Sequence, residues 1–415
     1  MAVMISFSEA QRLLHQNAEL LASETVPVAS ALYRVLAEPV QAQETIPPFA
    51  NSAMDGFAVR HQDVQSASNT APIRLRIAGS SAAGEAPKKP VSIEKTAWRI
   101  MTGAAVPAGY DAVYPIENVT VDGELISVDS ACEAGAHIRK AGEDFAKGET
   151  FAKAGRRVTP AMIAALASTG IDSINVVEQP RVLHFATGSE LVESAQTPLQ
   201  PGQIRNSNSP FLQAALASMP VRAIYGGQVR DEPNEFITAL QSAMVMHKPH
   251  VVLTTGAVSA GDFDFIPRVI AELGGEIIFH KCTIKPGKPI LFARLPNNVF
   301  FFGLPGNPVS TAVGLRFFVT PFLRRLQGLP DAPLSTAMLR GHLHKPKADW
   351  RFFLKARCES DDSGRMIIEV QGGQESHKIK PLIDSNAWLV LDEGRTHFAN
   401  GDLVHYCSLL DAGLE

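Results

Sequence analysis

The stretch VFFFGLPGNPVSTAVGLRFFVTPFLRRLQ, residues 299–327, decides the class of fold. Its first four residues are a short apolar run, which is typical of a buried strand. A turn over residues 303–308 follows, in which Asn307 suits an N-cap and Pro308 suits the first position of a helix running to residue 327. A strand, a glycine-containing loop and a helix in this order are typical of an α/β domain.

The same alternation extends through residues 181–328. We expect strands at residues 182–186, 222–225, 251–254, 276–279, 290–294 and 299–302, and helices at residues 209–218, 233–247, 262–273 and 308–327. Near-continuous apolar strands separated by helices indicate a mostly parallel sheet, and such sheets bind ligands beyond the carboxyl ends of their strands.

The flanking regions have other patterns. Ser6 and Glu9 have capping-box spacing and predict a helix from about Phe7, and Thr159 with Pro160 predicts another helix over about residues 159–169. Short strands with frequent turn residues predict a β-rich module, at residues 57–59, 73–77, 97–101, 112–114 and 125–128. After residue 330, an antiparallel β module, a small barrel, is expected from strands at residues 352–357, 366–370, 387–391 and 403–410.

Length and composition exclude several classes of protein. A chain of 415 residues predicts two to four domains, and a net charge of -4 with 19% charged residues argues against disorder and against nucleic-acid binding through bulk positive charge. The four cysteines are scattered without metal-ligand spacing, so neither a zinc site nor a disulfide framework is expected.

The sequence contains no candidate membrane span, because no run approaches the ~18 consecutive apolar residues that a span requires. We therefore expect a cytoplasmic protein without membrane contact.

Four loops of the α/β region carry the candidate chemistry. They are residues 186–190 with 201–206, residues 254–262, residues 285–289 and residues 303–308. Glycine backbone and a helix N-terminus can wrap an anion, and Lys281, Lys285 and Lys288 can neutralise phosphate. Each loop taken alone is also compatible with an ordinary turn, and the lysines with a solvated basic turn. Neither G-x-G-x-x-G nor a P-loop is present, which disfavours a dinucleotide enzyme or a P-loop NTPase.

Carboxylates at predicted loop positions could hold Mg²⁺ with phosphate oxygens, or could be helix caps and surface charges. They are Glu190, Asp231, Asp262 and Asp264. In the β-rich module, Asp55-Gly56 could form a hairpin turn, and residues 99–103 and 142–144 could be strand-end turns. The residues by themselves therefore indicate a multidomain protein with an anionic-ligand site.

Eight segments, in this order, resemble the motifs of the MoeA family of molybdopterin molybdenumtransferases, to which the gephyrin E domain also belongs. They are NSAMDGFAV, RIMTGA, GED, ATGSEL, GQIRNSN, TTGAVSAGDFDF, IKPGKP and FGLPGNPVS. The resemblance implies a multidomain α/β plus β fold: a molybdopterin-binding α/β domain with a mostly parallel sheet, an inserted β-rich module, a discontinuous N-terminal domain and a C-terminal β-barrel. The implied boundaries are residues 1–46 with 145–178 (N-terminal), 47–144 (inserted), 179–328 (α/β) and 329–415 (barrel).

The resemblance also implies an activity: insertion of molybdate into adenylylated molybdopterin with Mg²⁺-dependent release of AMP. It implies a homodimer and contact with other proteins of molybdenum cofactor biosynthesis. The implied metal ligands are Asp231, Asp264 and Glu190, and the implied catalytic residues are Asp55, Thr102, Asp144, Glu190, Lys281 and Lys285. The residues implied to bind substrate are Gly188, Gly256, Ser259, Lys285, Lys288, Pro305, Gly306, Pro308, Arg351 and Ser376. Asp55, Thr102 and Asp144 are expected to reach the site from the partner subunit.

Three positions depart from the family pattern. Ser189 and Asn206 stand where the family usually has Asp, and Ala257 stands in place of a glycine. Two fewer carboxylates predict a changed Mg²⁺ affinity, and an alanine in a glycine-like conformation predicts an altered loop. The alternatives to the transferase are a dimeric scaffold with weak or no activity, and a molybdopterin adenylyltransferase.

Overall fold

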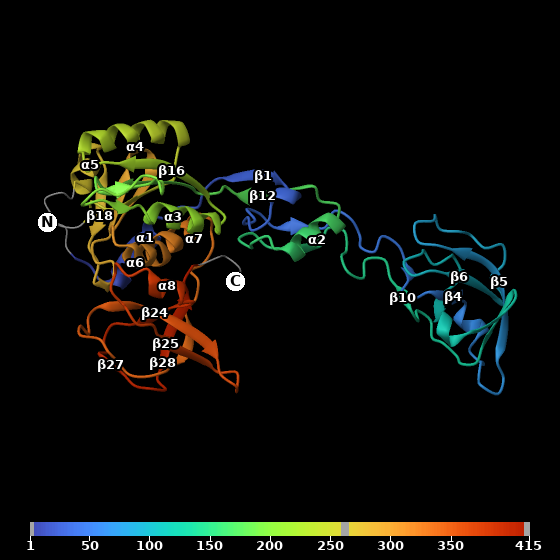
Figure 1. Ribbon diagram of the computed structural model, residues 1–415. Coiled ribbons are helices and arrows are strands. Elements are labelled where there is room, and N and C mark those ends of the chain that lie inside the picture. Colours follow the sequence, from blue (N-terminus) through green and yellow to red (C-terminus); the bar gives the residue numbers. More distant parts are fainter. Residues whose placement is uncertain (1–3, 259–264, 411–415) are drawn as a thin grey trace.

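The computed structural model describes residues 4–258 and 265–410. The molecule is elongated: the α/β sheet and the C-terminal barrel lie at one end, and the β-rich module lies at the other (Figure 1). A smaller unit with β1 (Ser23–Pro27), β12 (Ser173–Val177) and α2 (Pro160–Ser168) lies between them. Among the described residues, no helix is both long and apolar enough to cross a bilayer.

The α/β sheet has six strands in the order β16-β13-β17-β21-β20-β18. Their bounds are Arg222–Val229, Arg181–Thr187, Val251–Thr255, Val299–Leu304, Leu291–Leu295 and Glu276–His280. The first four are parallel, and β20 is antiparallel to both of its neighbours, so the predicted mostly parallel sheet is confirmed. Ala186, Thr255 and Leu304 are in register, so the loops after β13, β17 and β21 leave the sheet at one edge.

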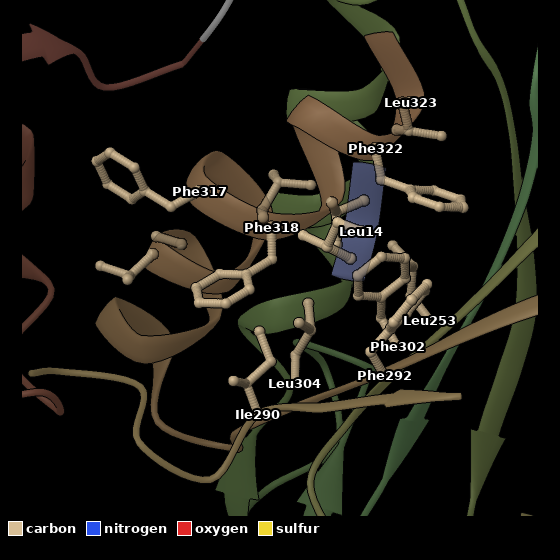
Figure 2. Packing of buried hydrophobic residues seen from close by; sticks show 14 of the residues in the cluster. Leu14, Leu253, Ile290, Phe292, Phe302, Leu304, Phe317, Phe318, Phe322 and Leu323 are labelled. Carbon is tan, nitrogen blue, oxygen red and sulfur yellow. The ribbon is translucent and has the colours of Figure 1, made fainter. Parts of the chain in front are cut away.

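Helices cover both faces of this sheet. One face and its helices form a core with residues of α1, α3, α6 and α7, and the other face packs against α4 and α5. Their bounds are Phe7–Asn17, Asn208–Ala217, Pro308–Gly314, Thr320–Leu326, Pro233–His247 and Ile266–Glu272. Figure 2 shows Leu14 of α1 and Phe322 of α7 gathered with Phe292 and Phe302 of the sheet.

The helix expected over residues 308–327 contains a π-helical turn, Leu315–Val319, between α6 and α7. Pro321 follows that turn, and a proline has no N–H to donate to the carbonyl four residues earlier. The carbonyl of Phe317 instead accepts a hydrogen bond from Gln11 Nε2 of α1, at 2.8 Å. The N-terminal helix therefore satisfies a backbone acceptor that the proline leaves without its helical donor.

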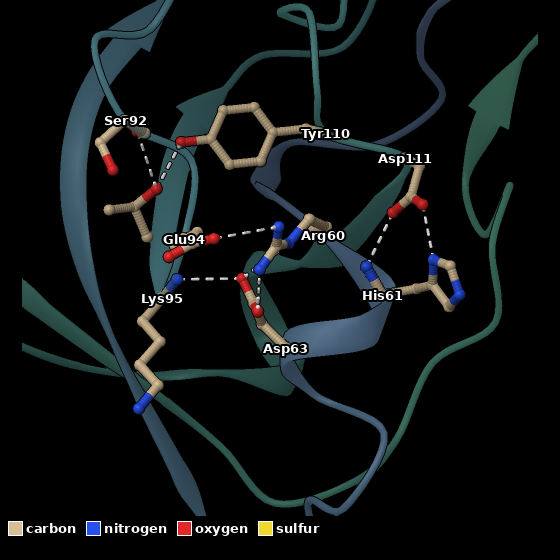
Figure 3. A network of polar contacts seen from close by, with 9 residues as sticks. Arg60, His61, Asp63, Ser92, Glu94, Lys95, Tyr110 and Asp111 are labelled. Carbon is tan, nitrogen blue, oxygen red and sulfur yellow. Dashed lines mark hydrogen bonds and ion pairs between the residues drawn. The ribbon is translucent and has the colours of Figure 1, made fainter.

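The inserted module contains a six-stranded sheet in the order β7-β4-β6-β5-β9-β8. The bounds are Ala112–Pro115, Gly56–Val59, Thr96–Ile100, Ile73–Ser81, Leu125–Val128 and Thr120–Asp122. Figure 3 shows the polar network that connects its loops. Asp63 pairs with Arg60 and accepts the backbone N–H of Lys95. Asp111 accepts the backbone N–H of His61 and also contacts the ring of that histidine.

Asp55-Gly56 does not form the predicted hairpin turn. The strand before it, β3 (Asn51–Ser52), pairs with β10 (Ile138–Arg139), whereas the strand after it, β4, pairs with β6 and β7.

The middle unit is built from two separate parts of the chain. β1 (Ser23–Pro27) pairs with β12 (Ser173–Val177), and β2 (Val40–Gln41) pairs with β11 (Thr150–Ala152). Helix α2, Pro160–Ser168, begins after Thr159, whose side chain accepts the N–H of Met162, as predicted. One hydrophobic cluster contains side chains from both parts of the chain, which joins them across the insertion.

The C-terminal region is a closed barrel of five strands. β24, β25, β22, β28 and β26 are neighbours in that order, and the pairing of β24 with β26 closes the sheet. Their bounds are Arg351–Ser360, Met366–Val370, Ser335–Leu339, Leu403–Ser408 and Ala387–Leu391. β22 and β25 run parallel, so the prediction that this module is antiparallel is wrong for that pair of strands. The remaining short elements are β23 (Leu343–His344), β27 (His397–Phe398) and α8 (Lys380–Ile383).

The barrel is joined to the α/β domain by a strand. β19, Ile284–Lys285, belongs to the lysine-containing loop and pairs in parallel with β24, with Lys285 opposite Phe352. The stacked rings of Phe317 and Phe353, with centroids 3.9 Å apart, join the cores of the two domains. This junction places the lysine loop between the sheet edge and the barrel.

Candidate active site

The first cavity lies at the edge of the α/β sheet where its parallel strands end, and we call it the edge cavity. It encloses about 460 Å³. It is lined by Thr187, Gly188, Glu190, Leu191, Ile204, Asn208, Asp231, Thr255, Gly256, Ala257, Val258, Pro289, Pro305, Gly306 and Asn307. The predicted glycines Gly188, Gly256 and Gly306 therefore come together in one cavity, from three different loops.

Close backbone approach explains the glycines. Gly256 has φ +106°, and a Cβ there would lie 2.7 Å from the carbonyl oxygen of Thr187. A Cβ on Gly306 would lie 3.7 Å from the Cα of Gly256, so the loops after β17 and β21 nearly touch. Ala257 does adopt a left-handed conformation, with φ +53°, as its position in a glycine-like loop predicts. This conformation costs an L-residue about 1–2 kcal/mol.

Two of the expected metal ligands, Glu190 and Asp231, line the edge cavity. Asp231 Oδ2 accepts the N–H of Ser189 at 3.0 Å, and the Ser189 hydroxyl accepts the N–H of Asp231 at 3.3 Å. Ser189 thus fixes Asp231 by a reciprocal pair of bonds instead of adding a carboxylate. Asp264 and Ser259, two further predictions, lie outside the described residues, as does Asp262.

No metal cage is formed by the described side chains alone. Within residues 4–258 and 265–410, no three side chains of His, Cys, Asp or Glu gather closely enough to hold an ion. Mg²⁺ usually takes one or two carboxylates and completes its shell with water and substrate phosphates. Glu190 and Asp231, which both line the edge cavity, provide the number of carboxylates that this mode requires.

The turn that carries Glu190 is held by a residue that sequence reasoning missed. Gln228 of β16 donates from Nε2 to the carbonyl oxygens of Leu191, at 2.9 Å, and Gly188, at 3.3 Å. The two carbonyls flank Glu190 in the chain. A glutamine within an otherwise ordinary strand gives no sequence signal of this contact with the preceding loop.

Two asparagines of the segment GQIRNSN have structural partners. Asn206 Oδ1 accepts the N–H of Ser209 in the first turn of α3, at 3.1 Å, so the residue that replaces the family's Asp caps a helix here. Asn208 Nδ2 donates to the carbonyl oxygen of Gly306 at 2.8 Å. Its buried Oδ1 has no hydrogen-bond partner in the described chain. Asn208 was also missed as an individual residue, although the motif that contains it was recognised.

The second cavity lies between the lysine loop and the barrel, and we call it the lysine cavity. It encloses about 900 Å³. Its polar lining includes Lys285, Lys288, Asn307, Ser310, Glu375, Ser376 and His377. Lys285 Nζ lies 5.5 Å from the ring centroid of Phe352, and Lys288 Nζ lies 5.8 Å from that of Trp350, distances at which a ring attracts a cation. The predicted residues Lys285, Lys288, Pro305 and Ser376 therefore share this cavity.

The two cavities share a wall. Pro289, Pro305 and Asn307 line both of them. A molecule in the edge cavity and an anion in the lysine cavity would thus be separated only by the two loops that carry these residues. The arrangement can bring two anionic reactants together.

The helix N-terminus at α6 differs from the prediction. The side chain of Asn307 makes no capping bond, although its backbone is extended as an N-cap requires. The N–H of Val309 donates to the carbonyl oxygen of Ser376 in the barrel, at 3.1 Å. One of the N–H groups expected to face an anion is therefore used to attach the barrel. Pro308 is in the first turn of α6 and is absent from the described lining of both cavities.

Two predicted cations lie elsewhere. Lys281 follows β18 with φ +80°, bonded through its backbone to Ile5 and Ile290, and neither cavity's described lining includes it. Arg351 lines a different, smaller cavity, and its guanidinium lies 2.8 Å from a carboxylate oxygen of both Asp392 and Glu393. Because ion pairs occupy the Arg351 guanidinium, it is not positioned as a free anion ligand.

The remaining predictions are in the inserted module. Asp55 Oδ1 accepts bonds from the N–H (2.7 Å) and the hydroxyl (2.9 Å) of Thr102, and these bonds lower the pKa of Asp55. Asp144 is exposed, in a turn whose backbone bonds to Ile46. The structure brings Asp55 and Thr102 together, but the whole module lies at the opposite end of the molecule from the α/β sheet and the barrel of its own chain (Figure 1).

Comparison with known families agrees with this architecture. Residues 184–325, which carry the edge cavity, match a probable molybdopterin-binding domain, and this defines the class of protein. Residues 5–170 match the MoeA N-terminal region, domains I and II, and residues 336–409 match the MoeA C-terminal region, domain IV. The chain belongs to the MoeA family.

Relatives match nearly the full length. The molybdopterin molybdenumtransferase of Synechococcus elongatus is 37% identical over 98% of this chain and 100% of its own. That of Bacillus subtilis is 35% identical over 92% of this chain and 89% of its own. The crystal structure of the molybdopterin biosynthesis moeA protein from Pyrococcus horikoshii OT3 superposes with a TM-score of 0.81 at 28% identity, over 97% of this chain and 99% of that one.

Proposed function

We propose that this protein is a molybdopterin molybdenumtransferase, which places molybdenum from molybdate on the dithiolene of adenylylated molybdopterin and releases AMP. The single observation that carries the proposal is the wall that the edge and lysine cavities share, formed by Pro289, Pro305 and Asn307. A site for two anionic reactants needs adjoining pockets, and holding both in place lowers the barrier to their reaction. The activity in the names of the full-length relatives agrees with this assignment.

The two cavities have different tasks in this reaction. The glycine loops of the edge cavity suit a phosphate, because glycines let backbone N–H groups approach an anion closely. Lys285 and Lys288 suit molybdate, because two exposed ammonium groups can contact a tetrahedral oxyanion without the cost of a buried cation. The edge cavity therefore binds the nucleotide end of the substrate and the lysine cavity binds the oxyanion.

Magnesium has a defined place in this proposal. Glu190 and Asp231 would hold the ion, with Asp231 fixed by its two hydrogen bonds to Ser189. When bound, the ion would supply positive charge that stabilises the phosphate oxygens of the substrate. Gln228 keeps the turn around Glu190 in place, so the carboxylate faces the cavity before substrate arrives.

The active protein is a homodimer in this proposal. Asp55, Thr102 and Asp144 lie in the module at the far end of the molecule, and only a second chain could bring that module to the edge cavity. The preformed bonds between Asp55 and Thr102 provide a rigid polar surface for that contact. None of the four cysteines forms a disulfide, which supports a reducing, cytoplasmic location where other proteins of cofactor biosynthesis can be met.

The test is release of AMP. Purified protein is incubated with adenylylated molybdopterin, molybdate and Mg²⁺, and we expect AMP to form only when all three are present. Lys285→Ala should lower turnover, whereas Lys380→Ala, which removes an exposed lysine outside both cavities, should not. Absence of AMP under every metal condition rejects the proposal, and consumption of ATP instead would assign an adenylyltransferase.

A further inference from the structure

One wall of the lysine cavity is a barrel loop, residues 371–378, which carries Glu375, Ser376 and His377. Loops at a surface are usually mobile, yet an anion ligand must be held in place if it is to contribute to binding. The loop belongs neither to a strand nor to a regular helix. Its conformation therefore depends on contacts with the rest of the barrel.

The loop is built around a fully buried lysine. Lys355 of β24 is 0% exposed. Its Nζ donates to three backbone carbonyl oxygens of the loop region: Gly373 at 2.7 Å, Lys378 at 3.0 Å and Glu375 at 3.3 Å. An ammonium group has three N–H donors, so these three carbonyls use its whole capacity. Burial lowers the pKa of Lys355, and the nearby charge of Glu375 opposes that effect. The three carbonyl dipoles point their negative ends at the ammonium and so also favour its charged form.

Gln374 ties the same loop to the backbone of the same lysine. Its Oε1 accepts the N–H of Lys355 at 3.0 Å, and its Nε2 donates to the carbonyl oxygens of Gln371 at 2.7 Å and Lys355 at 2.8 Å. The loop thus contacts both the main chain and the side chain of one residue. Ser376 then reaches across to the α/β domain, where its carbonyl accepts the N–H of Val309.

A second buried lysine has the same chemistry at another loop. Lys345 is also 0% exposed, and its Nζ donates to the carbonyl oxygens of Asp392 at 2.5 Å, Trp350 at 2.7 Å and Ala348 at 3.3 Å. Trp350 and Pro346 line the lysine cavity from that side. Two internal ammonium groups therefore hold two separate loops of the cavity, and each provides a control for the other.

We propose that Lys355 is a positioning residue for the oxyanion: it does not contact the anion, but its ammonium group holds residues 371–378 so that Ser376 and His377 face molybdate in the lysine cavity. The inference rests on the proposed function, of which it deepens the anion site. A lysine that only stabilised the barrel would affect folding without changing anion affinity selectively.

The first measurement is hydrogen exchange of the complete protein without substrate. In Lys355→Met, which keeps an unbranched side chain one atom shorter and removes the ammonium, we expect exchange of residues 371–378 to rise at least about tenfold, because three carbonyl contacts are lost. Lys345→Met should instead raise exchange in residues 346–350. Lys380→Ala removes an exposed lysine side chain two residues beyond the loop, so it should match the wild type.

The second measurement is equilibrium dialysis with molybdate alone, together with the molybdate dependence of AMP release. We expect the Kd and KM for molybdate to rise about tenfold in Lys355→Met, with kcat within twofold of the wild type. Unchanged loop exchange, or a loosened loop with unchanged molybdate affinity, would overturn the inference, as would a wild type that binds no molybdate. A wild type that binds molybdate without releasing AMP would overturn the proposed function alone. If Lys355→Met does not fold, Gln374→Ala, which loosens the same loop through its amide, provides the same tests.

Discussion

Acid should lower the free energy of unfolding of this protein through one buried histidine in an interior strand of the α/β sheet. His184 lies in β13 and is 0% exposed, and neither ring nitrogen has a hydrogen-bond partner in the described chain. Its ring lies 4.9 Å from that of Tyr225 on the neighbouring strand. Burial lowers the pKa of His184 from 6.5 to about 4. The folded chain therefore keeps this ring neutral over a pH range in which the unfolded chain protonates it.

The sign and size of the effect follow from linkage. Between pH 6.5 and 4 the unfolded state binds more protons at this position, so the free energy of unfolding falls as the pH is lowered. A shift from 6.5 to about 4 corresponds to roughly 3 kcal/mol when complete, of which about 2.5 kcal/mol is lost by pH 4.5. Above pH 6.5 the contribution is constant.

His184→Leu removes the titrating ring, and urea unfolding of both proteins at pH 7.5 and 4.5 measures the difference. Trp388 packs against Phe317 in the core shared by the sheet and the barrel, so its fluorescence reports unfolding of that body. Trp98 lies in the inserted module and is replaced by Phe in both proteins. We expect the wild type to lose about 2.5 kcal/mol more than His184→Leu between these pH values. All other titrating groups are common to the two proteins, so the difference between them isolates His184. Equal losses of unfolding free energy in the two proteins would therefore refute the reasoning.

Three further outcomes are expected at the edge cavity. Ser189→Asp adds a carboxylate beside Asp231 and should lower the Mg²⁺ concentration for half-maximal AMP release by about fivefold, since affinity rises with ligand charge. An unchanged Mg²⁺ titration would contradict this. Ala257→Gly should raise the free energy of unfolding by about 0.5 kcal/mol, because the strain relieved at the left-handed position slightly exceeds the cost of the unfolded-state entropy that glycine adds. Urea unfolding measures this change, and a loss of stability would contradict it. Gln228→Leu should reduce kcat about tenfold while stability changes little, because the turn around Glu190 loses both of its hydrogen bonds from the Gln228 amide. A kcat equal to that of the wild type would show that these bonds are not needed to position Glu190.

Local signals predicted the local structure well. Helix α4, Pro233–His247, has the predicted bounds, and Ser6 caps α1 by accepting the N–H of Glu9. Both features depend on residues within one or two turns of each other, which a single sequence displays directly. The π-helical turn before Pro321 was not predicted, because the donor to Phe317 comes from Gln11, 306 positions away in the chain.

The parts of the candidate site that contain motif glycines and exposed lysines could be predicted from the sequence. The parts that depend on contacts between residues far apart in the chain could not. Gly188, Gly256 and Lys285 line the cavities as the motifs suggested. Lys355 looks in the sequence like a solvated charge on a strand, and only the closed barrel reveals that it is buried. The ion pairs of Arg351 depend on a turn after β26 that contains Glu393, 42 residues later, so its sequence position gave no sign that the guanidinium is engaged.

The strand β19 has a consequence for how reactants enter. Ile284 and Lys285 form a strand that pairs with β24 of the barrel, and the stacked rings of Phe317 and Phe353 pack across the same interface. The barrel therefore cannot rotate away from the α/β domain without breaking this strand pairing. The oxyanion must therefore enter through an opening that already faces solvent, rather than through a hinge between these two bodies. A truncated protein that ended near residue 330 would lose one side of its pocket and expose aromatic surface to water.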